Sequence, residues 1–71
     1  MNFKKFCFEF LAKYRTDHRC DFIWEALEDK DFPWEGDADA GVYYLESENA
    51  NPKCVQCYED LQEMYASGLT F

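Results

Sequence analysis

Residues 22–34 contain an apolar stripe with helical spacing, followed by a proline that must end the helix. Pro33 has no backbone N–H and moves the residue before it out of helical geometry, so we expect a helix from about residue 18 that ends by about residue 31. Phe32 then lies in a loop, and leaving its ring in water would cost roughly 1.5–3 kcal/mol. We therefore expect Phe32 to enter the core from this loop. The helical stripe consists of Phe22, Ile23, Ala26 and Leu27.

Residues 2–15 show the strongest helical periodicity in the chain, with Asn2 as a candidate cap. Either Thr16 or Asp17 is suited to cap the next helix. We also expect Arg15 to pair with an acid of another helix. The expected buried stripe is Phe3, Phe6, Cys7, Phe10, Leu11 and Tyr14.

Two more helices are expected in the second half. Asp37 is a plausible N-cap of a short helix in which Val42, Leu45 and one of Tyr43 or Tyr44 face inward, although Gly41 lowers its propensity. Reading residues 41–45 as a strand would leave that strand unpaired, so we reject it. Asn51 followed by Pro52 is a helix-start signal, and Gly68 is a natural end for a helix that runs to about residue 67. Its expected stripe is Cys54, Cys57, Tyr58, Leu61, Met64 and Tyr65.

The length of 71 residues predicts one domain, residues 1–71, and a chain this short needs a dense core. Aromatic residues make up 20% of the chain and can supply that core. We therefore predict an all-α fold, a compact bundle of about four short helices. No apolar run is long enough for a membrane span and the N-terminus lacks a secretory signal, so we expect a cytoplasmic protein. We also expect it to be a monomer or a weak dimer.

Several segments, in order along the chain, resemble the YozE-like, SAM-like family of small uncharacterised Firmicutes proteins. The resemblance implies two crossing helical hairpins, and because the family has no established activity it implies no site residues. The chain departs from the family pattern in a shorter connector before Phe22 and at Tyr58, Leu61 and the cysteines. The matching segments are Phe6, residues 10–15, residues 26–33, residues 44–46, residues 58–60 and Tyr65.

The net charge of −8 is unevenly distributed. Residues 1–19 carry a net +3 and residues 20–71 a net −11, which disfavours nucleic acid and membrane surfaces as partners. Two alternatives remain: weak nucleic-acid binding through the basic first helix, and an acidic mimic of nucleic acid that inhibits a DNA-binding protein. The basic residues at the N-terminal end are Lys4, Lys5, Lys13, Arg15 and Arg19. The acids considered for the mimic are Asp29, Asp31, Glu35, Asp37, Asp39, Glu46 and Glu48.

Metal and catalytic signals are weak. Cys54 and Cys57 have the spacing of zinc ligands, with Cys20 and His18 as a poor second half, but they lie within an expected helix. We therefore interpret these cysteines, together with Cys7, as reduced core thiols. No nucleophile accompanies His18 and no phosphate-binding glycine loop is present, so we predict no catalytic residues, no metal and no cofactor.

The remaining prediction is a protein-binding module without enzymatic activity. Trp34 lies among acidic residues and could be an exposed anchor for a protein partner. The candidate contact residues are Trp34, Glu35, Asp37, Asp39 and Tyr43.

Overall fold

The computed structural model describes residues 2–69 and contains four helices in that range. The helices are α1 (Phe3–Lys13), α2 (Cys20–Glu28), α3 (Ala38–Ser47) and α4 (Pro52–Ala66). No strand occurs between residues 2 and 69, and residues 41–45 lie within α3. The predicted all-α bundle of four short helices is confirmed.

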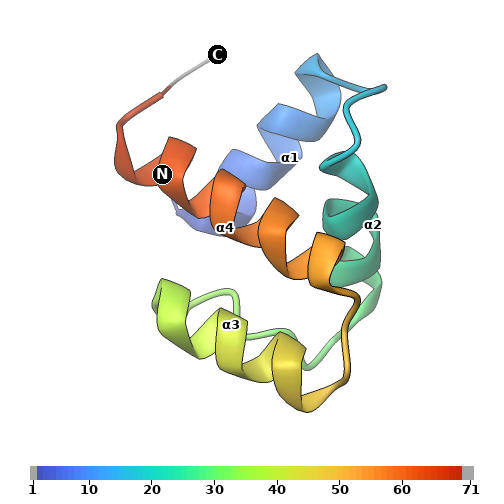
Figure 1. Cartoon of the computed structure of the whole chain (residues 1–71). Coiled ribbons are helices and arrows are strands. Elements are labelled where there is room, and N and C mark those ends of the chain that lie inside the picture. The colour runs from blue at the N-terminus through green and yellow to red at the C-terminus, as the bar shows by residue number, and fades with distance from the viewer. Residues whose placement is uncertain (1, 70–71) are drawn as a thin grey trace.

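Helix α4 is the central element of this bundle. It packs against each of the other three helices, and it lies between α3 on one side and the pair α1 and α2 on the other (Figure 1). Helices α1 and α2 also pack against each other, whereas α3 packs against α4 alone among the described helices. The core therefore forms where α1, α2 and α4 meet, with α3 added from one side.

Three helices begin with the expected side-chain caps. The side-chain oxygen of Asn2 accepts the N–H of Lys5 at 2.8 Å. Asp37 accepts the N–H of Ala40 at 2.9 Å, and Asn51 accepts the N–H of Lys53 at 2.8 Å. These bonds satisfy backbone donors that a helix leaves free at its first turn.

Helices α3 and α4 end in the same hydrogen-bonded motif. Gly68 follows α4 with a φ of 80°, and Asn49 follows α3 with a φ of 57°. After α4, the N–H of Leu69 bonds to the carbonyl of Met64, and after α3 the N–H of Ala50 bonds to the carbonyl of Leu45. This Schellman arrangement requires a left-handed residue, which glycine and asparagine tolerate best.

Helix α2 is shorter than predicted at both ends. It begins at Cys20, two residues later than expected, and ends at Glu28. Its start is organised by Asp17, and not by Thr16, because the Asp17 carboxylate accepts the N–H of Arg19 at 2.9 Å in a turn that precedes the helix.

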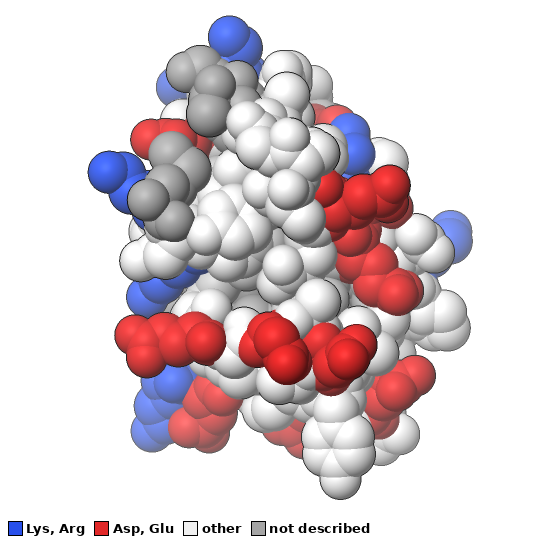
Figure 2. Space-filling view, turned by 90° about the vertical axis from the view of Figure 1, so that its left-hand side faces the viewer, with Lys and Arg blue, Asp and Glu red and all other residues white. Residues whose placement is uncertain are grey.

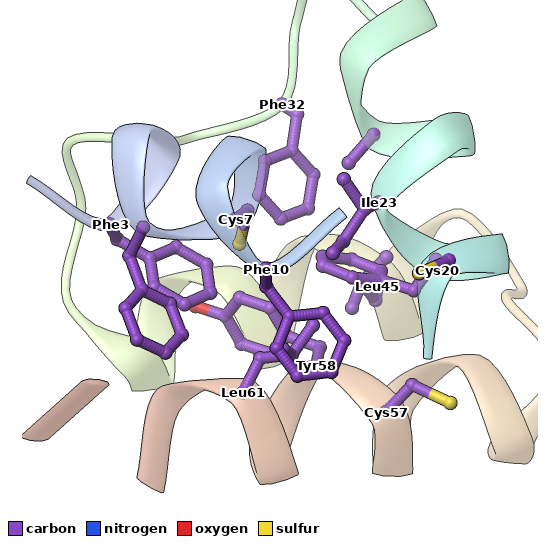
Figure 3. Packing of buried hydrophobic residues seen from close by; sticks show 13 residues of the cluster. Phe3, Cys7, Phe10, Cys20, Ile23, Phe32, Leu45, Cys57, Tyr58 and Leu61 are labelled. Carbon is purple, nitrogen blue, oxygen red and sulfur yellow. The ribbon is translucent and has the colours of Figure 1, made fainter. Parts of the chain in front are cut away.

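Phe32 enters the core from the loop after α2, as predicted, and only 6% of its surface is exposed (Figure 3). Its ring packs edge-on against those of Phe22, Tyr44 and Tyr58, with centroids 5.6–5.8 Å apart. The loop therefore supplies a core residue that joins α2, α3 and α4. The buried core comprises Phe3, Phe6, Cys7, Phe10, Cys20, Phe22, Ile23, Ala26, Phe32, Leu45, Cys57, Tyr58 and Leu61.

The predicted burial of one stripe residue, Tyr14, is wrong. Tyr14 is 43% exposed because it lies at the end of α1, where its ring rests on Phe10 at a centroid distance of 5.0 Å. In α3, Tyr44 is the tyrosine that packs against the core, while Tyr43 is exposed. The remaining stripe residues pack at the edge of the core and are partly buried. They are Leu11, Leu27, Val42, Cys54, Met64 and Tyr65.

Candidate functional site

Two large aromatic side chains are exposed on adjoining helices. Phe8 of α1 is 51% exposed and Trp24 of α2 is 56% exposed. They line one shallow groove of about 450 Å³ together with Leu11, Ala12 and Arg15. We call this feature the Phe8–Trp24 groove.

Helix geometry explains why both rings face solvent. The buried residues of α1 recur three or four positions apart, and Phe8 lies on the opposite side of the helix. Trp24 likewise falls between the buried residues Ile23 and Ala26 of α2, on a different face. Neither ring is needed to fill the core. Contiguous exposed apolar surface of this kind marks interaction sites on soluble proteins.

The two walls of the groove carry opposite charge. Exposed Lys5 lies one turn before Phe8 on α1, and exposed Arg15 lies in the turn that follows α1. On α2, exposed Asp21 and Glu28 lie one turn on either side of Trp24. None of these four charges forms an ion pair within residues 2–69. The charges bordering both rings are therefore available to a partner.

The prediction that Arg15 pairs with an acid of another helix is wrong, since Arg15 forms no ion pair within the described residues. The arginine that is paired is Arg19. Its guanidinium donates to both carboxylate oxygens of Asp17, at 2.9 and 2.7 Å. It also lies over the Phe10 ring at 5.3 Å and contacts the sulfur of Met64 at 3.7 Å. The hydrogen bond from the Arg19 side chain is the largest cause that holds the pKa of Asp17 far below its usual range.

Trp34, the predicted anchor, is partly buried. Its ring centroid lies 4.8 Å from that of Phe32 and 5.9 Å from that of Phe3, and the Lys4 ammonium lies 5.8 Å from it. It borders a hollow of about 500 Å³ together with Lys4 and Glu35. Trp34 therefore serves mainly to close the core, and offers less free ring surface than Phe8 or Trp24.

The other predicted contact residues are exposed and lie around α3. Tyr43 is 76% exposed, and it makes no ring contact with Trp34 in the described part of the chain. Glu35 and Asp39 are exposed, whereas the carboxylate of Asp37 is engaged in capping α3. The structure thus places these residues on accessible surface without joining them into one aromatic site.

The acidic side chains form separate groups on the face that includes the start of α3 and one side of α4. Figure 2 shows these groups with uncharged surface between them, and with basic side chains mainly along one edge. A nucleic-acid mimic would present a continuous track of negative charge. The face seen in Figure 2 is strongly acidic, but the track is interrupted.

The cysteines are unpaired, and burial raises the pKa of each thiol, that of Cys7 to about 12. Cys7, Cys20 and Cys57 are buried, and the Cys20 thiol donates to the carbonyl of Tyr14 at 2.9 Å. Between residues 2 and 69, no three His, Cys, Asp or Glu side chains come together as metal ligands. The possible zinc set of His18, Cys20, Cys54 and Cys57 is therefore not assembled.

Comparison of the chain with protein-family models, curated proteins and solved structures gives no match. The resemblance to the YozE-like family therefore stays a prediction that rests on the quoted residues. None of the helices within residues 2–69 has both the length and the apolar character required to cross a bilayer.

The sequence contained a signal for the groove that the predicted site did not use. Phe8 and Trp24 are aromatic residues that stand outside the apolar stripes of their own helices. A ring off the stripe of an amphipathic helix must point away from the core that the stripe defines. Two such rings on consecutive helices would have pointed to this surface.

Proposed function

We propose that this chain is a protein-binding module without catalytic activity, and that its contact surface is the Phe8–Trp24 groove. The observation that carries the proposal is a single groove lined by two rings, each more than half exposed. Completing the burial of such rings against a partner is favourable, because each fully buried large apolar side chain contributes roughly 1.5–3 kcal/mol. Tryptophan is also enriched among residues that dominate binding energies.

The absence of a catalytic role in this proposal is supported by the chemistry of the reactive groups. The four thiols are held protonated by burial, which disfavours the nucleophilic thiolate. His18 is exposed in the connector before α2, and its nearest ionic partner is Asp17 at 3.6 Å. The free, mostly buried cysteines also favour a reducing compartment such as the cytoplasm.

A protein partner is favoured over nucleic acid by the charge distribution. The net charge is −8, whereas nucleic-acid binding requires a basic footprint. Arg19, one of the five basic residues near the N-terminus, is engaged with Asp17 and Phe10 and is not free for phosphate. Of the other basic residues, Arg15 lines the aromatic groove and Lys4 lies over the ring of Trp34.

The second candidate function is an acidic mimic of nucleic acid, favoured by the exposed carboxylates around α3. Glu35, Asp39 and Glu46 are all exposed. This candidate requires a different surface from the groove, so variants separate the two. Replacing these three acids by their amides would abolish binding by a mimic, and would leave a partner of the groove bound.

The test compares proteins retained by immobilised wild-type and variant chains from a lysate of the cells that produce the protein. The groove variant is Phe8→Ser with Trp24→Ser. The matched control is Tyr43→Ser, an exposed aromatic on α3, which is also one of the predicted contact residues. Far-ultraviolet circular dichroism establishes that each variant retains its helices.

The expected result is a protein retained by the wild type and by Tyr43→Ser, and lost with the groove variant. Loss with Tyr43→Ser and retention by the groove variant would move the contact surface to α3. Retention that depends only on Glu35, Asp39 and Glu46, and that vanishes at high salt, would favour the mimic.

A further inference from the structure

We propose that a second copy of this chain covers the Phe8–Trp24 groove, in a weak two-fold symmetric dimer with α1 of each copy on α2 of the other. The inference rests on the proposed function, since it takes the groove to be the contact surface. It adds the identity of one partner and the orientation in which that partner binds.

The charges on the two walls of the groove carry this inference. A two-fold interface uses the same patch on both copies, so the patch must be complementary to itself. The α1 wall, which includes the turn after α1, carries Lys5 and Arg15, and the α2 wall carries Asp21 and Glu28, all four exposed and without ion pairs in the described chain. Placing α1 on the partner's α2 brings opposite charges together twice, once on each side of the axis.

The same charges exclude the other symmetric arrangement. Placing α1 on the partner's α1 would oppose Lys5 and Arg15 to each other, and α2 on α2 would oppose Asp21 and Glu28. Like charges across an interface are unfavourable and reject wrong orientations. The aromatic residues supply the attraction between two copies, and the charges select how the copies meet.

The dimer is expected to be weak for two reasons. The described chain exposes 4931 Å² in total, and a standard stable interface would need about 800 Å² from each copy. A groove lined by five residues supplies only part of that area. Each copy also carries a charge of −8, which repels the other at low salt. At physiological salt, interactions between exposed charges more than about 8 Å apart are screened. The short-range interactions of the charges next to the groove then outweigh the repulsion between the net charges.

The first test is sedimentation equilibrium of the full chain across a wide range of concentration at physiological salt. The wild type and Tyr43→Ser are expected to increase in average mass toward twice that of one chain. Phe8→Ser with Trp24→Ser is expected to weaken dimerisation beyond about thirtyfold, as removal of two central aromatic contacts does. A wild type that stays monomeric, or a dimer unaffected by this double variant, overturns the inference.

The second test exchanges the charges of the two walls. Lys5→Glu with Arg15→Glu makes the α1 wall acidic, and Asp21→Arg with Glu28→Arg makes the α2 wall basic. Each variant alone is expected to dimerise about tenfold more weakly than the wild type, because the altered charges occur twice in the dimer. An equimolar mixture is expected to recover association, since each altered wall then faces a wall of opposite charge.

The outcomes separate this inference from the proposed function. Failure of the mixture to associate more strongly than either variant alone overturns the proposed orientation. A monomeric wild type that still retains a cellular protein through Phe8 and Trp24 overturns the dimer and leaves the protein-binding role standing. A dimer together with no retained cellular protein supports the second copy as the occupant of the groove.

Discussion

The ring of Tyr58 occupies the space that a side chain at Gly41 would fill. Gly41 is buried in α3, and a Cβ placed on it would overlap the hydroxyl and ring of Tyr58 from α4. Glycine is therefore required at this position for the close approach of α3 to α4, although it is a poor helix former.

Gly41→Ala is expected to destabilise the protein by about 1–3 kcal/mol, the cost of overpacking, despite the better helix propensity of alanine. Urea unfolding followed by circular dichroism measures this change. Ala40→Gly, at an exposed neighbouring position, gives the size of the propensity effect alone. An increase in stability with Gly41→Ala would show that the contact with Tyr58 does not constrain the packing of α3 on α4.

Phe32 and Phe8 form a matched pair for testing the core. Phe32→Ala is expected to lower the free energy of unfolding by about 3–5 kcal/mol, because it empties the position where the loop enters the core. Phe8→Ala is expected to change it by no more than about 0.5 kcal/mol, because the ring faces solvent. Equal effects in urea unfolding would contradict the assignment of Phe32 to the core and of Phe8 to the exposed surface.

The interaction of Asp17 with Arg19 predicts a dependence of stability on pH. The pKa of Asp17 is lowered in the folded protein, so its contribution is complete above the unfolded pKa of about 3.9 and is lost as the pH falls through the lower folded value. Because both side chains are partly exposed, we expect about 1 kcal/mol. Asp17→Asn should therefore lose less free energy of unfolding than the wild type as the pH falls below about 4. Parallel stability curves for wild type and variant below pH 4 would disprove the assignment.

Tyr44 donates a hydrogen bond to the Asp29 carboxylate at 2.5 Å, which connects α3 to the residue that ends α2. This bond raises the pKa of Tyr44, so the contribution is present below the unfolded pKa of about 10 and is lost as the pH rises through the folded value. Tyr44→Phe is expected to be less stable than the wild type at neutral pH, because it removes this hydrogen bond. The difference between Tyr44→Phe and wild type should shrink in urea unfolding at alkaline pH.

Most of the fold could be predicted because its signals are local. Asn2, Asp37 and Asn51 cap helices by bonding to backbone groups two or three residues away, so the sequence alone contains both partners. Pro33 likewise forces Phe32 out of the helix. The start of α2 was harder, because a turn held by Asp17 precedes the helix.

The exposure of the candidate contact residues could be predicted less well, because exposure depends on how separate segments meet. Trp34 is surrounded by acids in the sequence, but Phe3 from α1 covers part of its ring. Whether Arg15 or Arg19 finds a partner depends on the turn between α1 and α2, which the stripes do not specify. Gly41 was interpreted from propensity alone, and its role follows only from the approach of Tyr58.

Helix α3 packs against α4 alone among the described helices and is otherwise held by the contacts of Tyr44 with Asp29 and Phe32, which has a consequence for how the protein opens. A helix held on one side has fewer contacts to break than one enclosed by neighbours, so it detaches at lower cost than global unfolding. Amide protons of α3 should therefore exchange with solvent sooner than those of α4. Each such opening would briefly uncover Tyr58 and Phe32, while α1, α2 and the groove between them stay intact.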